Sequence, residues 1–99
     1  MKAQGSDRIA RRYFVRGRVQ GVGFRYFIEK SASAIGISGF ARNLDDGRVE
    51  VYAVGHPEQL SELEGLLWKG PRMADVRGVD SSEASIYDPE HGGYGFYIR

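Results

Sequence analysis

Apolar residues recur at the spacing of an α-helix in two stretches of the chain. In the first stretch, which begins near Phe24, the apolar side chains fall on one stripe and the charged ones face away, and Gly36 is a typical C-terminal stop. In the second stretch three leucines form the stripe, Pro57 stands in the first turn and Gly70 ends the pattern. The sequence therefore predicts two amphipathic helices.

Runs of β-branched and aromatic residues around these helices predict strands. They are expected at residues 13–15, 40–43, 49–53, 76–79 and 96–98. In the third run small aliphatic residues alternate with Glu50 and Tyr52, which predicts a strand with one buried face. Asp-Asp-Gly at residues 45–47 predicts a hairpin turn before it, because glycine adopts the positive φ that a tight turn requires.

The element order is therefore β-α-β-β-α-β, and the region of the last strand allows one further division. This order consists of two βαβ units in succession, and two such units place both helices on one face of an antiparallel sheet. The arrangement is the α+β, ferredoxin-like split βαβ sandwich (βαββαβ). Residues 1–11 are expected to form a flexible N-terminal tail and residues 12–99 the folded domain. The architecture leaves the function open, because it hosts enzymes, metal carriers, RNA binders and regulatory modules.

Composition narrows the possible functions. The 99 residues fit one domain, and the formal charge of +1 lacks the basic excess of a nucleic-acid-binding protein. The absence of cysteine excludes disulfides, thiolate catalysis and cysteine-ligated metals. No apolar run reaches the ~18 residues of a membrane span, and the N-terminal residues lack the apolar core of a secretory signal. We expect a cytoplasmic monomer with no membrane or nucleic-acid partner.

The loop from Gly17 to Gly23 joins the first strand to the first helix and carries three glycines. Glycines let neighbouring backbone N–H groups point into one concavity, and the adjoining helix N-terminus is positively polarised, so such a loop binds anions. Arg25 stands in the first helical turn, where its planar fork can grip two phosphate oxygens. The loop lacks the Lys and hydroxyl residue of the G-x-x-x-x-G-K-[ST] motif and the spacing of the dinucleotide fingerprint. It therefore predicts a phosphate site of another kind.

Two segments of the chain resemble the signatures of one known family. Residues 17–25, Gly-Arg-Val-Gln-Gly-Val-Gly-Phe-Arg, look like the first signature of the acylphosphatase family, and residues 39–50 look like the second. The resemblance covers residues 12–99. It implies a hydrolase that splits acyl phosphates into a carboxylate and inorganic phosphate, with no metal, no cofactor and no covalent intermediate.

The resemblance also implies a role for each site residue. Arg25 matches the phosphate-binding arginine, and Asn43 matches the asparagine that positions the attacking water. The loop whose backbone amides cradle the phosphate corresponds to Gly17, Arg18, Val19, Gln20, Gly21, Val22 and Gly23. Three positions depart from the family pattern, and none of them removes a charged or water-holding group. They are Phe40 where many relatives carry Trp, Leu44 where some carry a hydroxyl residue, and Gly23 where others carry a side chain.

These residue types suit the hydrolysis of an acyl phosphate. Phosphoryl transfer depends mainly on positioning and on stabilisation of charge, which Arg25 and the loop amides would supply. The side-chain amide of Asn43 can hold a water molecule but is a poor base. The leaving carboxylate has a conjugate acid with a pKa of roughly 4, so it departs without a general acid.

Two other functions stay open on this fold. Residues 93–96, Gly-Tyr-Gly-Phe, resemble the aromatic core of an RNA-binding signature, but only three residues follow them where that signature needs a helix and a strand. The same domain could also bind a phosphorylated ligand without turnover. On the simplest reading, Arg25 is a solvated surface residue and Asn43 a turn former.

Overall fold

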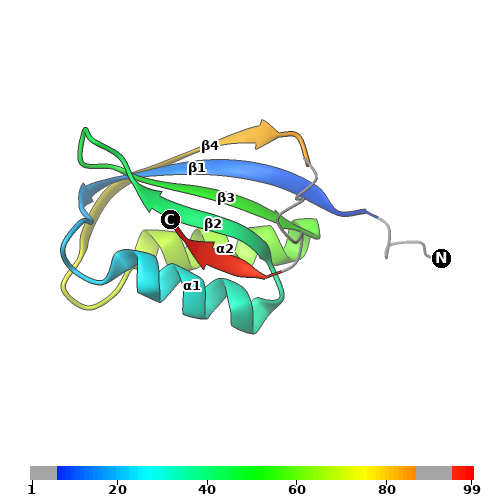
Figure 1. Cartoon of the computed structure of the whole chain (residues 1–99), viewed down its shortest axis with the longest axis horizontal. Coiled ribbons are helices and arrows are strands. Elements are labelled where there is room, and N and C mark those ends of the chain that lie inside the picture. The colour runs from blue at the N-terminus through cyan, green and yellow to red at the C-terminus, as the bar shows by residue number, and fades with distance from the viewer. Residues whose placement is uncertain (1–6, 87–94) are drawn as a thin grey trace.

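The computed structural model describes residues 7–86 and 95–99, which form one sheet covered by two helices (Figure 1). The strands are β1 (Ile9–Arg18), β2 (Ser38–Asn43), β3 (Val49–Gly55), β4 (Asp75–Ala84) and β5 (Phe96–Ile98), and the helices are α1 (Phe24–Ile35) and α2 (Pro57–Lys69). The order of strands across the sheet is β4-β1-β3-β2-β5. The βαββαβ order, with both helices on one face, confirms the predicted ferredoxin-like α+β fold, and the last strand region is divided into β4 and β5, the further division that the sequence allowed.

The prediction of an antiparallel sheet is wrong for β5, which pairs with β2 in parallel. The other strand pairs are antiparallel, so β2 and β4 run in opposite directions. A chain that turns back after β4 and reaches the free edge of β2 therefore arrives parallel to β2. The sheet is mixed, and β5 places Phe96 in the core while leaving Ile98 exposed.

Four strands are longer than the sequence predicted, and β1 and β4 differ the most from the prediction. β1 begins at Ile9, so residues 9–11 of the expected tail belong to the sheet. β4 extends to Ala84, because it pairs with almost the whole of β1. Residues 1–6 of the tail and residues 93–94 of the RNA-binding-like run lie outside the described residues.

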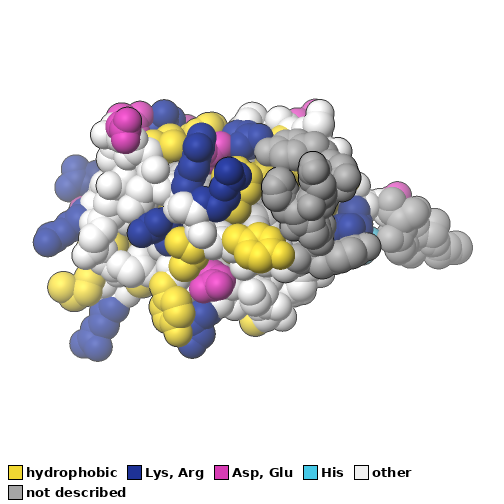
Figure 2. Space-filling view, viewed as in Figure 1, with side chains coloured by type: hydrophobic (Ala, Val, Ile, Leu, Met, Phe, Trp, Pro, Cys, Tyr) yellow, Lys and Arg dark blue, Asp and Glu magenta, His cyan; other side chains and the backbone are white. Residues whose placement is uncertain are grey.

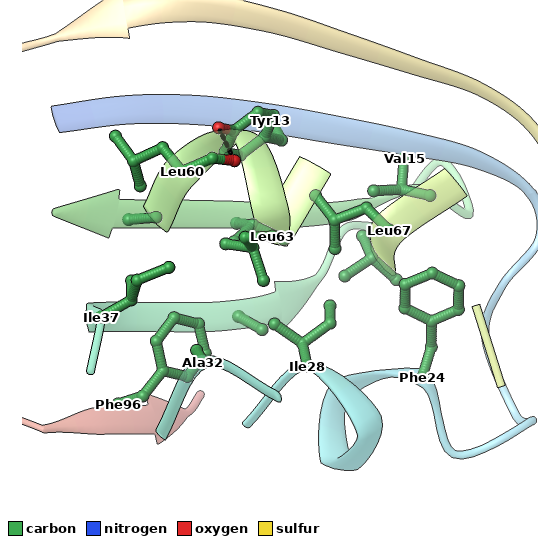
Figure 3. Close-up of a cluster of buried hydrophobic side chains, with 14 of the residues drawn as sticks. Tyr13, Val15, Phe24, Ile28, Ala32, Ile37, Leu60, Leu63, Leu67 and Phe96 are labelled. Carbon is green, nitrogen blue, oxygen red and sulfur yellow. Dashed lines mark hydrogen bonds between the residues drawn. The ribbon is translucent and has the colours of Figure 1, made fainter. Parts of the chain in front are cut away.

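The apolar core lies between the sheet and the two helices (Figure 3). The predicted stripes of both helices face it, with Ile28 of α1 and Leu63 of α2 fully buried. Tyr13 of β1 donates its hydroxyl to the backbone oxygen of Leu60 at 3.3 Å. Burial raises the pKa of Tyr13 to about 12, so the hydroxyl keeps its proton for this bond. Phe24, the first residue of α1, is also buried, so core packing fixes where the helix starts.

β3 is buried on both faces, whereas its alternation predicted one buried face. It is the central strand, and side chains of its neighbours cover the sheet face away from the helices. Glu50 is 4% exposed and forms ion pairs with Arg12 of β1 and Arg42 of β2. Tyr52 stacks on Phe40 with ring centroids 5.6 Å apart. Long and flat side chains can bury a central strand in this way without a second layer of helices.

Two opposing effects act on the carboxyl group of Glu50. Burial raises its pKa, but the hydrogen bonds and charges of Arg42 and Arg12 outweigh burial, so the pKa of Glu50 lies below its usual value. A carboxyl group whose pKa is lowered by folding adds stability above its unfolded pKa and loses it as the pH falls through the folded pKa. The contribution of Glu50 is therefore complete at neutral pH and is lost in acid, below about pH 4.

Replacing Glu50 with Gln should lower the free energy of unfolding at pH 7 by about 1–2 kcal/mol, because the charge that both arginines contact is removed. The deficit should shrink at pH 3, because the carboxyl group of Glu50 in the unfolded parent protein is protonated there, which removes the stability that the lowered pKa of the folded state provides. Urea unfolding of the two proteins at both pH values measures this effect. Glu62→Gln, a change of an exposed acid on α2, is the control and should unfold like the parent protein. A deficit of the same size at both pH values would contradict the assignment.

Candidate functional site

The segment between β1 and α1 forms an open turn lined by glycine. Gly21 and Gly23 adopt left-handed backbone conformations with φ of 76° and 79°. A Cβ atom at either position would meet nothing within 4 Å, so the turn is open on the side these residues face. Left-handed residues in a turn bring neighbouring N–H groups towards one side, which is the arrangement of an anion-binding nest.

Packed residues hold both ends of this turn in place. Val19 is 1% exposed and Phe24 is 2% exposed. Gly17 and Arg18, which the sequence placed in the loop, belong to β1. Gly17 has a structural role, since a Cβ there would lie 2.2 Å from the backbone oxygen of Asp75 in β4. The open turn is therefore shorter than the predicted loop.

The N-terminus of α1 adds a positive end beside the turn. Gly23 is the N-cap, no side chain caps the helix within the described part of the chain, and no acidic residue stands in its first turn. The first helical hydrogen bond runs from Phe27 N–H to the oxygen of Gly23 at 3.0 Å. The N–H groups of residues 24–26 are left without helical partners, so they and the helix dipole favour an anion.

Gln20 ties the turn to the hairpin that follows Asn43. Its side-chain Nε2 donates to the backbone oxygens of Leu44, at 2.8 Å, and Arg48, at 2.9 Å. The same hairpin is closed by a bond from Leu44 N–H to Arg48 oxygen at 2.8 Å. The backbone N–H of Arg48 also donates to Asp46, and this hydrogen bond lowers the pKa of Asp46. The two sequence motifs therefore meet through the side chain of Gln20.

Arg25 is linked to β2 through the last residue of the chain. Its Nη1 donates to the backbone oxygen of Arg99 at 2.9 Å, and Arg99 N–H donates to the oxygen of Ala41 at 2.8 Å. Ala41 lies two residues before Asn43 on the same strand. A guanidinium carries five N–H donors, so this contact orients Arg25 and leaves other donors for a ligand.

Asn43 is the exposed last residue of β2 and pairs with Val49 of β3. The links made by Gln20 and Arg25 therefore bring the open turn, the guanidinium and the end of β2 to one region. The turn and Arg25 can hold a tetrahedral anion, and the amide of Asn43 can hold a water molecule beside it. Sequence reasoning missed the side chain of Gln20 and the backbone of Arg99. The position of Gln20 within the glycine-rich loop was the only local signal for the first, and nothing local indicated the second.

Outside this region, His56 has a structural role, and the described residues contain no candidate metal site or membrane-spanning helix. His56 is the N-cap of α2, and its backbone N–H donates to Gln59 Oε1 at 2.8 Å. Among residues 7–86 and 95–99, no group of three His, Cys, Asp or Glu side chains could hold a metal ion. In the same part of the chain, neither helix is long and apolar enough to cross a membrane.

Comparison with known proteins points to one family. The sequence profile described as acylphosphatase matches residues 11–98. An acylphosphatase of Solibacter usitatus is 60% identical over 85 residues, which cover 86% of this chain and 88% of that protein. An acylphosphatase of Archaeoglobus fulgidus is 46% identical over 82 residues, covering 83% and 92%. The solved structure of an acylphosphatase from Coxiella burnetii superposes with a TM-score of 0.87 at 31% identity and covers 100% of both chains.

Replacing Gln20 with Ala should loosen the hairpin at residues 44–48, because both bonds from the turn are lost. We expect the free energy of unfolding to fall by about 1–2 kcal/mol. Hydrogen exchange of the Leu44 amide, followed by NMR, should become faster than in the parent protein. Ser33→Ala, a change of an exposed residue of α1, is the control and should leave this exchange rate unchanged. Unaltered protection of the Leu44 amide in the Gln20 variant would show that the two hydrogen bonds from Gln20 are not required to hold the hairpin.

Proposed function

The chain belongs to the acylphosphatase family, and we propose that it hydrolyses acyl phosphates at the turn between β1 and α1, where Arg25 binds the phosphoryl group and Asn43 holds the attacking water. The activity is that of a hydrolase acting on acid anhydrides. The links through Gln20 and Arg99 carry the assignment of the site, because they join the turn, Arg25 and the end of β2.

The phosphoryl group binds to the turn as a dianion. Backbone N–H groups of residues 19–23 and the first N–H groups of α1 donate to its oxygens. Arg25 contributes a planar pair of donors and a full positive charge. Charge in the transition state spreads over the three equatorial oxygens, so donors that are already in place stabilise it without rearrangement.

The water molecule attacks phosphorus from the side of Asn43. The amide of Asn43 orients the water, and a phosphate oxygen of the substrate takes up its proton. The bond between phosphorus and the carboxyl oxygen breaks, and the carboxylate leaves with the electron pair. A carboxylate is a stable anion at neutral pH, so no side chain has to protonate it.

The reaction needs no metal ion or cofactor in this proposal, because Arg25 and the turn supply the positive charge that a metal would otherwise provide. The substrate is an acyl phosphate and one product is inorganic phosphate. Action as a cytoplasmic monomer, without membrane or nucleic-acid partners, stays a prediction from the sequence. A module that binds RNA or a phosphorylated ligand without turnover would release no phosphate in the assays below.

Arg25→Ala should lower kcat/KM for benzoyl phosphate by about 100- to 1,000-fold, because the charged clamp on the phosphoryl group is lost. Phosphate release at neutral pH, with a chelator present, measures the rate. Arg25→Lys should recover only a small part, since an ammonium cannot make the paired contact. Full activity in Arg25→Ala would show that Arg25 takes no part in the proposed site.

Asn43→Ala should lower kcat for benzoyl phosphate by about 100-fold or more, because the water is no longer aimed at phosphorus. Competitive inhibition by inorganic phosphate should stay close to that of the parent protein, since Arg25 and the turn are intact. Asp45→Ala, a change of an exposed turn residue two positions away, is the matched control and should keep full turnover. Loss of phosphate inhibition with normal turnover in the Asn43 variant would reverse the two roles.

A further inference from the structure

A surface groove of about 530 Å³ begins at the end of the open turn. Val22 and Gly23 of the turn form one end, and Tyr26 and Phe27 of α1 form a wall. Pro71, which follows α2, also lines the groove. The groove is thus continuous with the site proposed for the phosphoryl group. Its lining is mainly apolar and aromatic, which suits a carbon chain or ring better than an anion.

The groove lies on the side of the turn away from Asn43. Gln20, near one end of the turn, contacts the hairpin that follows Asn43, whereas Val22 and Gly23 at the other end line the groove. The geometry of α1 also places the groove on the side away from Arg25. Residues two apart on an α-helix point about 200° apart around its axis, so Phe27 lies on the flank opposite Arg25. Arg25 contacts the chain end beside β5, and Phe27 faces the groove.

This placement matches what in-line displacement requires. The attacking water and the leaving oxygen lie on opposite sides of phosphorus during phosphoryl transfer. With the water held by Asn43, the carboxyl oxygen and its acyl group must point away from β2. We propose that the groove is the acyl-group site of the enzyme, and that it selects acyl phosphates with an aromatic or bulky apolar acyl group over acetyl phosphate. This inference rests on the proposed function.

The side chains of the groove fit such an acyl group. Tyr26 is 59% exposed, so its ring is available to a ligand. Lys30, one turn further along α1, places its ammonium 5.5 Å from the centroid of that ring. Figure 2 shows apolar and basic side chains next to each other along its lower edge, where α1 runs in Figure 1. A flat ring can stack on Tyr26 and exclude water from it, whereas an acetyl group is too small to cover it.

Hydrolysis of benzoyl phosphate and acetyl phosphate by the whole chain and by Tyr26→Ala tests the proposal. We expect kcat/KM for benzoyl phosphate to fall by about fivefold in the variant and that for acetyl phosphate to change by less than about twofold. Inhibition by inorganic phosphate should be unchanged, which shows that the phosphoryl site is intact. Trp68→Ala, a change of another exposed aromatic residue on the other helix, is the matched control and should leave the ratio of the two substrates unaltered.

The outcomes separate the two proposals. A fall confined to benzoyl phosphate, seen in Tyr26→Ala and not in Trp68→Ala, supports the acyl-group site. An equal change for both substrates, or no change for either, overturns it while leaving the proposed function in place. Failure of the parent protein to hydrolyse either substrate would instead overturn the proposed function.

Discussion

The two hydrogen bonds that Gln20 donates to the backbone oxygens of Leu44 and Arg48 join segments that are 24 and 28 residues apart in the chain. One segment is the open turn that can bind an anion, and the other follows the strand that ends at Asn43. Hydrogen bonds from one side chain to two carbonyls fix both distance and orientation. The relative position of phosphate and water in the proposed reaction depends on these two hydrogen bonds, because the phosphate-binding turn and Asn43 belong to different segments.

The hydrogen bonds of Gln20 join the hairpin to a turn whose two ends are already packed into the core. Val19 and Phe24 are buried on either side of glycines that face open space. In the proposed reaction, the phosphoryl group would therefore meet donors whose conformational entropy was lost when the protein folded. The second link, from Arg25 to the backbone of Arg99, orients the guanidinium in the same way. Figure 3 shows the buried side chains, Phe24 among them, on which this arrangement is built.

Local patterns predicted the parts of the fold that depend on local interactions. Both helices begin and end where their stripes, proline and glycines indicated, because capping and amphipathic burial are encoded within each segment. The parallel pairing of β5 and the double burial of β3 were missed, since both depend on which strands become neighbours. Glu50 shows the reason. It looks like a solvent-facing residue in its own strand, and only Arg12 and Arg42 from two other strands make its burial possible.

The residues of the candidate site show the same difference between local and long-range interactions. Arg25, Asn43 and the glycine-rich turn could be chosen from short motifs, whereas the side chain of Gln20 and the backbone of Arg99 act through contacts with distant segments. A crystal structure of the protein with vanadate, which adopts the five-coordinate geometry of phosphoryl transfer, tests the central claim most directly. We expect the equatorial oxygens on the turn amides and Arg25, with one apical oxygen hydrogen-bonded to Asn43. Vanadate bound away from the turn, or seated there with Asn43 turned away from both apical oxygens, would contradict it.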